Sequence, residues 1–174
     1  MSGTRRETAR NLMSLAQSQG GYFTAKQALE TGYEYPQIVY HVSVGNFERV
    51  GHGLYRLPTI PLGENDELIR LTFWSRNQKD EPQAVVSHES ALVLHGLTEL
   101  LPNRIHLTVP QSFRKPTPKE CVLHKAKLEP DDIEEWEGFR VTKPLRTFVD
   151  AADGGVSLEQ LGKAIAEALV SCLT

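Results

Sequence analysis

The feature that most constrains this sequence is a series of three short helical patterns followed at once by a glycine-bounded pair of strand patterns. All of them lie within the first 58 residues. The first pattern, Thr4 to Gln17, repeats apolar residues at helical spacing, and Gly20-Gly21 ends it. Thr24 is placed to cap a second helix that reaches Glu30. Two helices are therefore expected before the third helical pattern.

The third helical pattern begins near Pro36, a residue suited to a first helical turn because it has no N–H to leave unpaired, and it ends at Gly45-Asn46. At 100° per residue this helix divides into two faces. The aliphatic face holds Ile38, Val39 and Val42, and the polar face holds Gln37, Tyr40 and His41. We expect the aliphatic face to pack on its own domain and the polar face to stay accessible.

Two strand patterns, residues 47–50 and 54–57, flank Gly51-His52-Gly53 and predict a hairpin. Three helices and then a hairpin is the order of a winged helix-turn-helix. In that motif the second helix enters the major groove and the wing touches the flanking backbone. We therefore predict a DNA-binding domain over residues 1–58. Its candidate DNA contacts are Gln37, Tyr40 and His41 on the helix, and Lys26, Arg49, His52 and Arg56 toward phosphates.

The small net charge of residues 1–58 limits the DNA affinity that this prediction allows. Residues 1–58 hold six Lys/Arg against four Asp/Glu, a sum of +2, in a chain whose net charge is −3. Affinity for double-stranded DNA from one copy is then modest, so DNA binding calls for a homodimer or for contacts from elsewhere. The competing interpretation is a winged helix that serves as a platform for protein interaction.

Composition sets the broad class. The chain has 174 residues, of which 40% are hydrophobic and 24% charged, as in an ordinary globular protein of one large or two small domains. No apolar run approaches the roughly 18 residues of a membrane span, and the polar start, Met1 to Arg10, does not resemble a secretory signal. A cytoplasmic protein is predicted. Cys121 and Cys172 are too few for a disulfide framework or a thiolate zinc site.

Linker chemistry over residues 59–65 separates a second module, residues 66–174, which is predicted to be α+β with a mostly antiparallel sheet. Helices are expected at 66–77, 87–95, from Pro144 and after Ser157, and strands at 104–109, 121–125, 133–136 and 139–142. In the helix from Pro144 the residues expected to face inward are Leu145, Phe148, Val149 and Ala152. In the last helix one side is expected to carry Leu158, Leu161, Ile165, Leu169 and Cys172.

A basic segment of this module is expected to form one patch on two strands and a proline-rich loop. Its members are Arg104, Arg114, Lys115, Lys119, Lys125 and Lys127. Such a patch suits a second contact with DNA, a contact with RNA, or the acidic surface of a partner. The plainer interpretation is a solvated strand edge that its lysines keep from aggregating.

Six histidines raise the question of a metal or a nuclease. His88 and His95 are about 10 Å apart in helical rise, too far for one ion, whereas His106 and His124 lie on different strands and can meet. Asp150 follows Arg146 at the spacing of a helix ion pair. No phosphate-binding loop or catalytic triad is evident. The sequence therefore predicts no cofactor, no metal and no enzyme. The alternative is a nucleic-acid-processing enzyme that uses His106, His124 or Asp150.

Several segments together resemble a known family. They are Phe23-Thr24-Ala25-Lys26-Gln27-Ala28, the wing from Phe47 to Pro58, the segment from Ser87 to Leu97, and the segment from Val141 to Asp150. In this order they resemble the AbiEi antitoxins of type IV abortive-infection systems, over about residues 20–155. The resemblance implies a winged-helix repressor that binds inverted repeats in its own promoter. It also implies that the second module counters a nucleotidyltransferase-like toxin without a stable complex. A stand-alone winged-helix regulator is the alternative.

Overall fold

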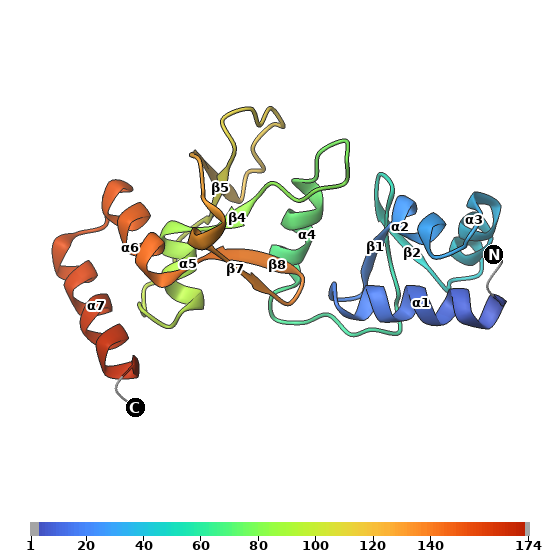
Figure 1. Ribbon diagram of the computed structural model, residues 1–174, viewed down its shortest axis with the longest axis horizontal. Coiled ribbons are helices and arrows are strands. Elements are labelled where there is room, and N and C mark those ends of the chain that lie inside the picture. Colours follow the sequence, from blue (N-terminus) through green and yellow to red (C-terminus); the bar gives the residue numbers. More distant parts are fainter. Residues whose placement is uncertain (1–3, 173–174) are drawn as a thin grey trace. The chain divides into compact units, whose positions relative to one another are not determined.

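The structure, a computed structural model, describes residues 4–172 (Figure 1). The chain divides into two compact units, one that ends at Phe73 and one that begins at Trp74. Each unit has its own sheet, with the strand orders β1-β3-β2 and β6-β5-β4-β8-β7. The predicted α+β class, with a winged helix at the amino-terminal end, is confirmed.

The first unit carries the predicted helices. They are α1 (Arg5–Gln17), α2 (Ala25–Glu30) and α3 (Tyr35–Ser43). Thr4 caps α1, since its Oγ1 accepts a hydrogen bond from the N–H of Glu7. Thr24 caps α2 through a reciprocal pair: its Oγ1 accepts from the N–H of Gln27, and Gln27 Oε1 accepts from the N–H of Thr24. The local start signals in the sequence are therefore used as predicted.

A three-stranded antiparallel sheet completes the winged helix. Its strands are β1 (Tyr22–Thr24), β2 (Glu48–Gly51) and β3 (Leu54–Arg56). The hairpin of β2 and β3 was predicted, whereas β1 was not, because three residues are too few to show an alternating pattern. β1 pairs with β3 with Phe23 opposite Tyr55. The core beneath the sheet contains Leu12, Ala16, Phe23, Ala28, Ile38, Phe47, Tyr55 and Leu57.

Helix α4 (Asp66–Trp74) begins where it was predicted, but most of it packs with the first unit. The hydroxyl of Tyr22 donates a hydrogen bond of 2.8 Å to Asp66 Oδ1, and the rings of Tyr22 and Phe73 lie 6.0 Å apart. Burial and this hydrogen bond raise the pKa of Tyr22 to about 12. The division at Phe73 therefore differs from the predicted boundary at residues 59–65, because contacts made after the linker tie α4 back to β1.

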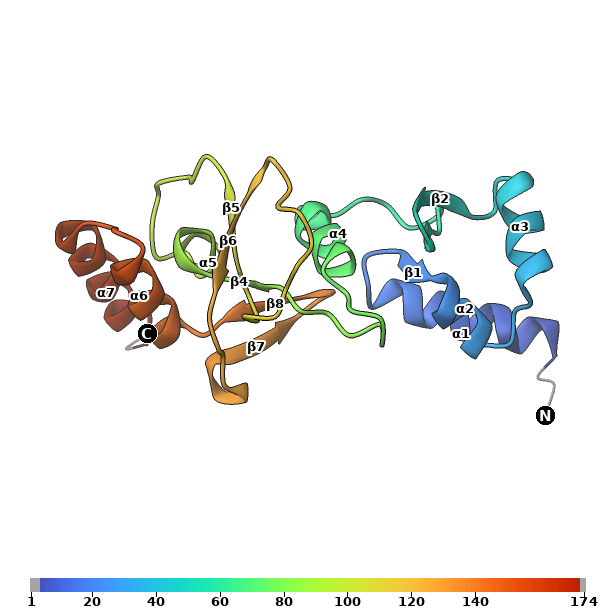
Figure 2. The ribbon, with the colours of Figure 1, turned by 90° about the horizontal axis from the view of Figure 1, so that it is seen from above.

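In the second unit the helices α5, α6 and α7 lie on one side of a five-stranded sheet (Figure 2). Its strands are β4 (Val85–Val86), β5 (Ile105–Val109), β6 (Cys121–Lys125), β7 (Ile133–Trp136) and β8 (Phe139–Thr142). Its helices are α5 (His88–Leu94), α6 (Pro144–Asp153) and α7 (Leu158–Cys172), with a 3-10 turn at Pro130–Asp132. Helix α5 packs against β5 and α6, and α7 packs on α6.

This sheet is mixed, which corrects the prediction of a mostly antiparallel one. β5 pairs with β6 in parallel, and β4 pairs with β8 in parallel, while β4–β5 and β7–β8 are antiparallel. The connection from β5 to β6, residues 110–120, is long enough to return the chain to the starting end of β5. The tight hairpin at Glu137-Gly138 lies where it was predicted, with Trp136 opposite Phe139.

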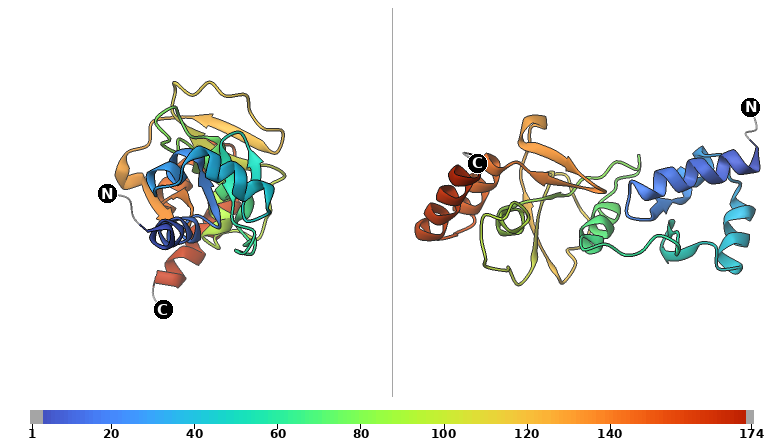
Figure 3. Two further views of the ribbon diagram at one scale, coloured as in Figure 1. Left: turned by 90° about the vertical axis from the view of Figure 1, so that its right-hand side faces the viewer. Right: turned by 90° about the horizontal axis from the view of Figure 1, so that it is seen from below.

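Helix α6, which lies beside α7 (Figure 3), turns a polar side toward the sheet. Thr147, Asp150 and Ala151 are buried, whereas Leu145 is 79% exposed and Val149 is 52% exposed. Ala152 is exposed too, so of the four residues predicted to face inward only Phe148 packs on the core. The spacing of apolar residues predicts a helix, but it does not predict which side of that helix is buried. In α6 the buried side contacts polar groups, among them Thr142 and Asp132.

Helix α7 follows its predicted pattern only in part. Leu161 and Ala164 are buried against Leu92 and Ala151. Three residues that were predicted to share that side are exposed: Leu158, Ile165 and Leu169. The side chain of Cys172 lies outside the described part of the chain.

Candidate nucleic-acid interface

The side of α3 that packs against its own domain is narrower than the sequence predicts. Ile38 is fully buried, and His41 and Val42 are half-buried one turn later. Val39, which was predicted to lie on the inward face, is 54% exposed. The inward stripe is therefore 38, 41 and 42, the i, i+3, i+4 spacing of a helix that touches its domain along one line.

His41 belongs to this inward stripe rather than to a free polar face. Its ring lies 4.7 Å from the ring of Phe47 and makes an edge contact with Tyr33 at 5.6 Å. Its Nδ1 is 3.0 Å from the side-chain amide nitrogen of Asn46. The prediction that His41 is turned toward DNA with Tyr40 is corrected in this respect, because the aromatic cluster holds the ring.

Gln37 is also engaged within the helix. Its Oε1 accepts a hydrogen bond of 2.7 Å from the N–H of Glu34, the residue that precedes α3, and its side chain is half-buried. Bidentate reading of adenine needs both the oxygen and the nitrogen of a Gln amide. The cap bond uses that oxygen, so Gln37 is a structural residue in this conformation.

The exposed face of α3 is more aromatic and aliphatic than the sequence indicated. Tyr40 is 60% exposed, and it is accompanied by Tyr35, Val39 and Val44. Apolar side chains in a major groove contact thymine methyl groups, and tyrosine hydroxyls reach phosphates. Of the three residues predicted on this helix, Tyr40 is the one that is exposed.

The wing presents two of its three predicted contacts. Arg49 on β2 and His52 at the tip are exposed. Gly53 adopts φ +63°, a left-handed conformation that glycine tolerates, and its carbonyl accepts a hydrogen bond of 2.9 Å from the N–H of Ala25. The tip of the wing is thus fixed to the first residue of α2.

Arg56 does not point outward. Its residue is 8% exposed, its Nη1 lies 3.7 Å from Glu48 Oε2, and its Nη2 donates to the carbonyl of Ile60. A guanidinium with these partners joins β3 to β2 and to the following segment. The predicted phosphate contact is corrected to a structural role.

Further basic residues of the first unit lie on its helices. Lys26 is exposed on α2, as its predicted role requires. Helix α1 adds the exposed Arg5, Arg6 and Arg10, which were not among the predicted DNA contacts. Three arginines close together at the start of one helix are the sequence feature that could have predicted them.

The second unit contains a cluster of three histidines from three elements. His88 starts α5, His106 lies on β5 and His124 on β6. The ring of His88 stacks on that of His124 at 3.5 Å, and His106 Nδ1 lies 3.0 Å from His124 Nε2. The predicted meeting of His106 and His124 is thus observed. The spacing on one strand pair does not predict that His88 joins them.

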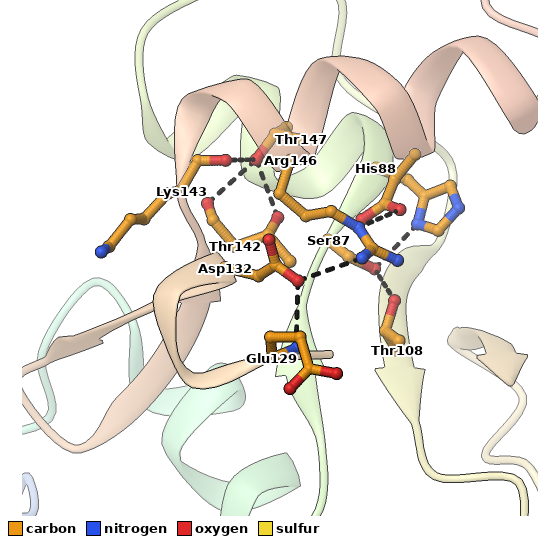
Figure 4. A network of polar contacts seen from close by, with 10 residues as sticks. Ser87, His88, Thr108, Glu129, Asp132, Thr142, Lys143, Arg146 and Thr147 are labelled. Carbon is orange, nitrogen blue, oxygen red and sulfur yellow. Dashed lines mark hydrogen bonds and ion pairs between the residues drawn. The ribbon is translucent and has the colours of Figure 1, made fainter. Parts of the chain in front are cut away.

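A chain of hydrogen bonds joins Thr108, Ser87 and His88 (Figure 4). Thr108 Oγ1 donates to Ser87 Oγ at 2.7 Å, and Ser87 Oγ lies 2.8 Å from His88 Nδ1. Because the hydroxyl of Ser87 accepts from Thr108, its own hydrogen remains available for a hydrogen bond to Nδ1 of a neutral His88. Burial, and then the neighbouring His124 and His106, lower the pKa of His88 to about 3.

The pKa values of the other two histidines are lowered as well. Burial is the largest cause for both His106 and His124. The backbone accommodates the stack in two places. His88 itself has φ +53°, and a Cβ on Gly154 would lie only 3.0 Å from His88 Cδ2. The cluster is therefore a neutral stack of rings that a small residue in α6 allows to approach closely.

Arg146 of α6 forms a second polar network, with Asp150 of the same helix and with Asp132; Figure 4 shows Arg146 and Asp132. Arg146 Nε donates to Asp150 Oδ1 at 2.8 Å, which confirms the predicted i, i+4 pair, and Arg146 Nη1 lies 3.2 Å from Asp132 Oδ2. Burial raises the pKa of Asp150, and its Oδ2 is buried with no hydrogen-bond partner. Polar groups of α6 are therefore turned inward because they form this network.

Comparison with known families supports the fold-based interpretation of the first unit. Residues 10–58 match the model of a family described as "Transcriptional regulator, AbiEi antitoxin". The resemblance to AbiEi antitoxins is confirmed over this module. The match includes α2, α3 and the wing and ends after β3. A comparison with curated proteins gives no match.

Outside the AbiEi match, the predicted basic patch divides into two groups. In the parallel pair, Ile105 lies opposite Cys121 and Val109 opposite Lys125, so the two ends are about 13 Å apart. Arg104 and Lys119 adjoin the first end, whereas Lys125 and Lys127 mark the second. Arg114 is held near the second end by the carbonyl of Gln111.

Lys115 has a structural role. Its ammonium donates to the carbonyls of Trp74 and Arg76 at 2.5 and 2.7 Å, and so ties the long loop to the start of the unit. Across residues 4–172, no group of three or more His, Cys, Asp or Glu side chains is arranged to hold a metal ion, and no helix is long and apolar enough to cross a membrane.

Proposed function

We propose that this chain is a DNA-binding transcriptional autorepressor and the antitoxin of a type IV toxin–antitoxin system. The observation that carries the proposal is the exposed face of α3, centred on Tyr40, beside a wing whose tip is pinned to α2. A helix that touches its domain along one narrow stripe leaves the rest of its surface for a groove. The AbiEi match over residues 10–58 supports the same interpretation.

On this proposal Tyr40 and Val39 contact base edges, while Lys26, Arg49 and His52 contact phosphates. The duplex target is an inverted repeat ahead of the chain's own gene, as the resemblance to AbiEi antitoxins implies, and two copies bind it as a homodimer. A pair of copies doubles the small positive charge that one module offers. The functional counterpart is a nucleotidyltransferase-like toxin that the chain counters without a stable complex.

A mobility-shift titration tests the DNA-binding part. The full chain is mixed with a duplex from its own upstream region and with a scrambled duplex, at 50 and 200 mM KCl. We expect tighter binding to the upstream duplex, weakening with salt, and at least tenfold weaker binding by Tyr40→Ala. Leu145→Ala, a change at an exposed residue of α6, is the matched control. Equal binding of both duplexes, or none, contradicts the proposal and favours a platform for protein interaction or a stand-alone regulator with another target.

Co-expression tests the antitoxin part. The neighbouring reading frame is expressed from an inducible promoter with and without this chain, and growth is followed. Rescue by the wild-type chain and by Tyr40→Ala alike assigns antitoxicity to the second unit. Failure of the wild-type chain to rescue growth contradicts the antitoxin assignment and leaves the DNA-binding assignment to its own test.

One observation favours a second candidate, a nucleic-acid-processing activity of the second unit. His124 lies against His106, and Asp150 is close enough to act on the charge of His124. The test is incubation with single-stranded RNA and DNA in the presence of Mg²⁺ or Mn²⁺. Cleavage that is lost in His124→Asn and in Asp150→Asn would support this candidate, and intact substrate would dismiss it.

A further inference from the structure

A cavity of about 540 Å³ opens in the second unit, and every residue that lines it belongs to that unit. Its floor is the sheet face that carries Val85, Thr108 and Arg140. The register fixes this face: Val85 pairs with Thr108, and Val86 pairs with Val141, so Val85 and Arg140 point to the same side. Loops that leave β5 and β6 form its walls, at residues 110–112 and 126–128.

Apolar side chains make up much of this lining. Val85, Val109, Leu128 and Ile133 are among the residues that line the cavity. Ligand pockets in proteins range from about 300 to 1,000 Å³ and are mostly apolar with a few polar groups that orient the ligand. The size and the chemistry of this cavity fit that class.

Arg140 supplies the charge. Its Nη2 donates to the carbonyls of Pro82 and Ala84 at 2.6 and 3.5 Å, and its Nε is buried with no hydrogen-bond partner. Burial lowers the pKa of its guanidinium. No carboxylate of residues 4–172 forms an ion pair with it within 4.0 Å, although the charge of its exposed cross-strand neighbour Glu135 attracts it from farther away. The two carbonyls orient this cation and leave its charge in place.

Three charged side chains line the cavity. Lys127 lies 2.7 Å from Glu129, and Glu81, which is exposed, accepts a hydrogen bond of 2.8 Å from the neutral amide of Asn77. Arg140 is the cation that lies half-buried among the apolar side chains of the lining. A single guanidinium suits a monoanion, and a carboxylate matches its planar fork.

We propose that this cavity binds a small organic carboxylate, with the carboxylate on Arg140 and an apolar body against Val85, Leu128 and Ile133. No residue of the winged helix lines this cavity. The test of ligand binding is therefore separate from the test of DNA binding. It gives the second unit a ligand-binding role besides the buried histidine network, to which Thr108 joins it.

Octanoate is the probe, and 1-octanol is the same chain without charge. Each is titrated into the ¹⁵N-labelled full chain and followed by ¹H–¹⁵N correlation spectra. We expect saturable shifts for octanoate at residues 109–112 and 126–128 and at the Arg140 Nε–H, with at least tenfold weaker binding of octanol. Arg140→Gln is expected to weaken octanoate binding at least tenfold and to leave octanol unchanged.

Two further variants keep the test decisive if Arg140→Gln fails to fold. Ser112→Trp obstructs the cavity and leaves Arg140 in place, so it should abolish the octanoate shifts. Lys119→Gln removes an exposed cation at the other end of the β5–β6 pair, outside the cavity lining, and should change nothing. Equal affinity for octanol, shifts confined to the exposed leucines of α7, or undiminished binding by Ser112→Trp would overturn the proposal.

Discussion

Gln37 Oε1 accepts a 2.7 Å hydrogen bond from the backbone N–H of Glu34, which makes Gln37 part of the amino-terminal cap of α3. Helix starts leave backbone N–H groups without intrahelical partners, and side chains near the start satisfy them. The residue that the sequence offers as a reader of adenine therefore holds the helix itself. On the proposed function, Val39 and Tyr40 of the same helix are the residues that contact the bases.

Gln37→Ala should lower the free energy of unfolding by about 1 kcal/mol, the usual cost of losing a cap. Gln37→Glu keeps an oxygen in the same place and should cost less. Urea denaturation of both variants measures the difference. Unchanged stability in Gln37→Ala, together with a changed base preference in the mobility shift, would return Gln37 to the role of a base reader.

Arg56 and Arg49 should respond differently to the same substitution. Arg56→Gln removes a buried guanidinium from Glu48 and Ile60 and should destabilise the domain by about 2 kcal/mol. Arg49→Gln changes an exposed residue and should leave stability unchanged. It should reduce by about one the slope of log affinity for DNA against log salt. Thermal unfolding and binding at several salt concentrations separate the two effects, and a reversed pattern would refute these assignments.

Stability should fall in mild acid because of His88. An unfolded histidine titrates near pH 6.5, whereas burial lowers the pKa of His88 to about 3 in the folded chain. Between these values the unfolded state binds a proton that the folded state does not. Stability is thus full above pH 6.5 and is lost as the pH falls, by up to about 1.4 kcal/mol per pH unit for this group.

His88→Asn is the matched variant for that prediction. Asparagine tolerates the left-handed backbone at this position, and its side-chain oxygen can accept from Ser87 as Nδ1 does. Denaturant midpoints between pH 4 and 7 should depend less on pH in the variant, with a remainder from His106 and His124. An identical pH dependence would mean that His88 is protonated in the folded chain.

Arg146 and Asp150 should be strongly coupled. Arg146→Gln leaves a buried carboxylate without its cation and should destabilise the second unit by about 3 kcal/mol. In Arg146→Gln with Asp150→Asn that charge is absent, so the double variant should be more stable than Arg146→Gln alone. A double-mutant cycle by chemical denaturation measures the coupling. Additive losses would show that the two side chains act independently.

Local signals in the sequence were enough for most elements of the fold. Thr24 and Ser87 mark helix starts, Pro144 opens α6, and Glu137-Gly138 turns a hairpin, and each depends on neighbours in sequence. The strands β1 and β4 have three and two residues, too few for an alternating pattern. The parallel pairing of β5 with β6 depends on where a long loop returns the chain, which local patterns do not encode.

The candidate sites were harder to predict because they depend on which side of an element meets a neighbour. Val39 and His41 exchange their expected sides, since the aromatic rings of Tyr33 and Phe47 attract His41 inward. In α6 the buried side is polar because Arg146 pairs with Asp150 and with Asp132 of the 3-10 turn. No spacing within the helix reveals that environment.

The central claim is that the exposed face of α3 and the tip of the wing contact duplex DNA. Titration of the ¹⁵N-labelled full chain with its upstream duplex, followed by ¹H–¹⁵N spectra, tests it most directly. If α3 and the tip of the wing contact the duplex, we expect shifts and line broadening to concentrate at residues 35–44 and 51–53. Changes confined to residues beyond Phe73, with α3 and the wing unaffected, would contradict it.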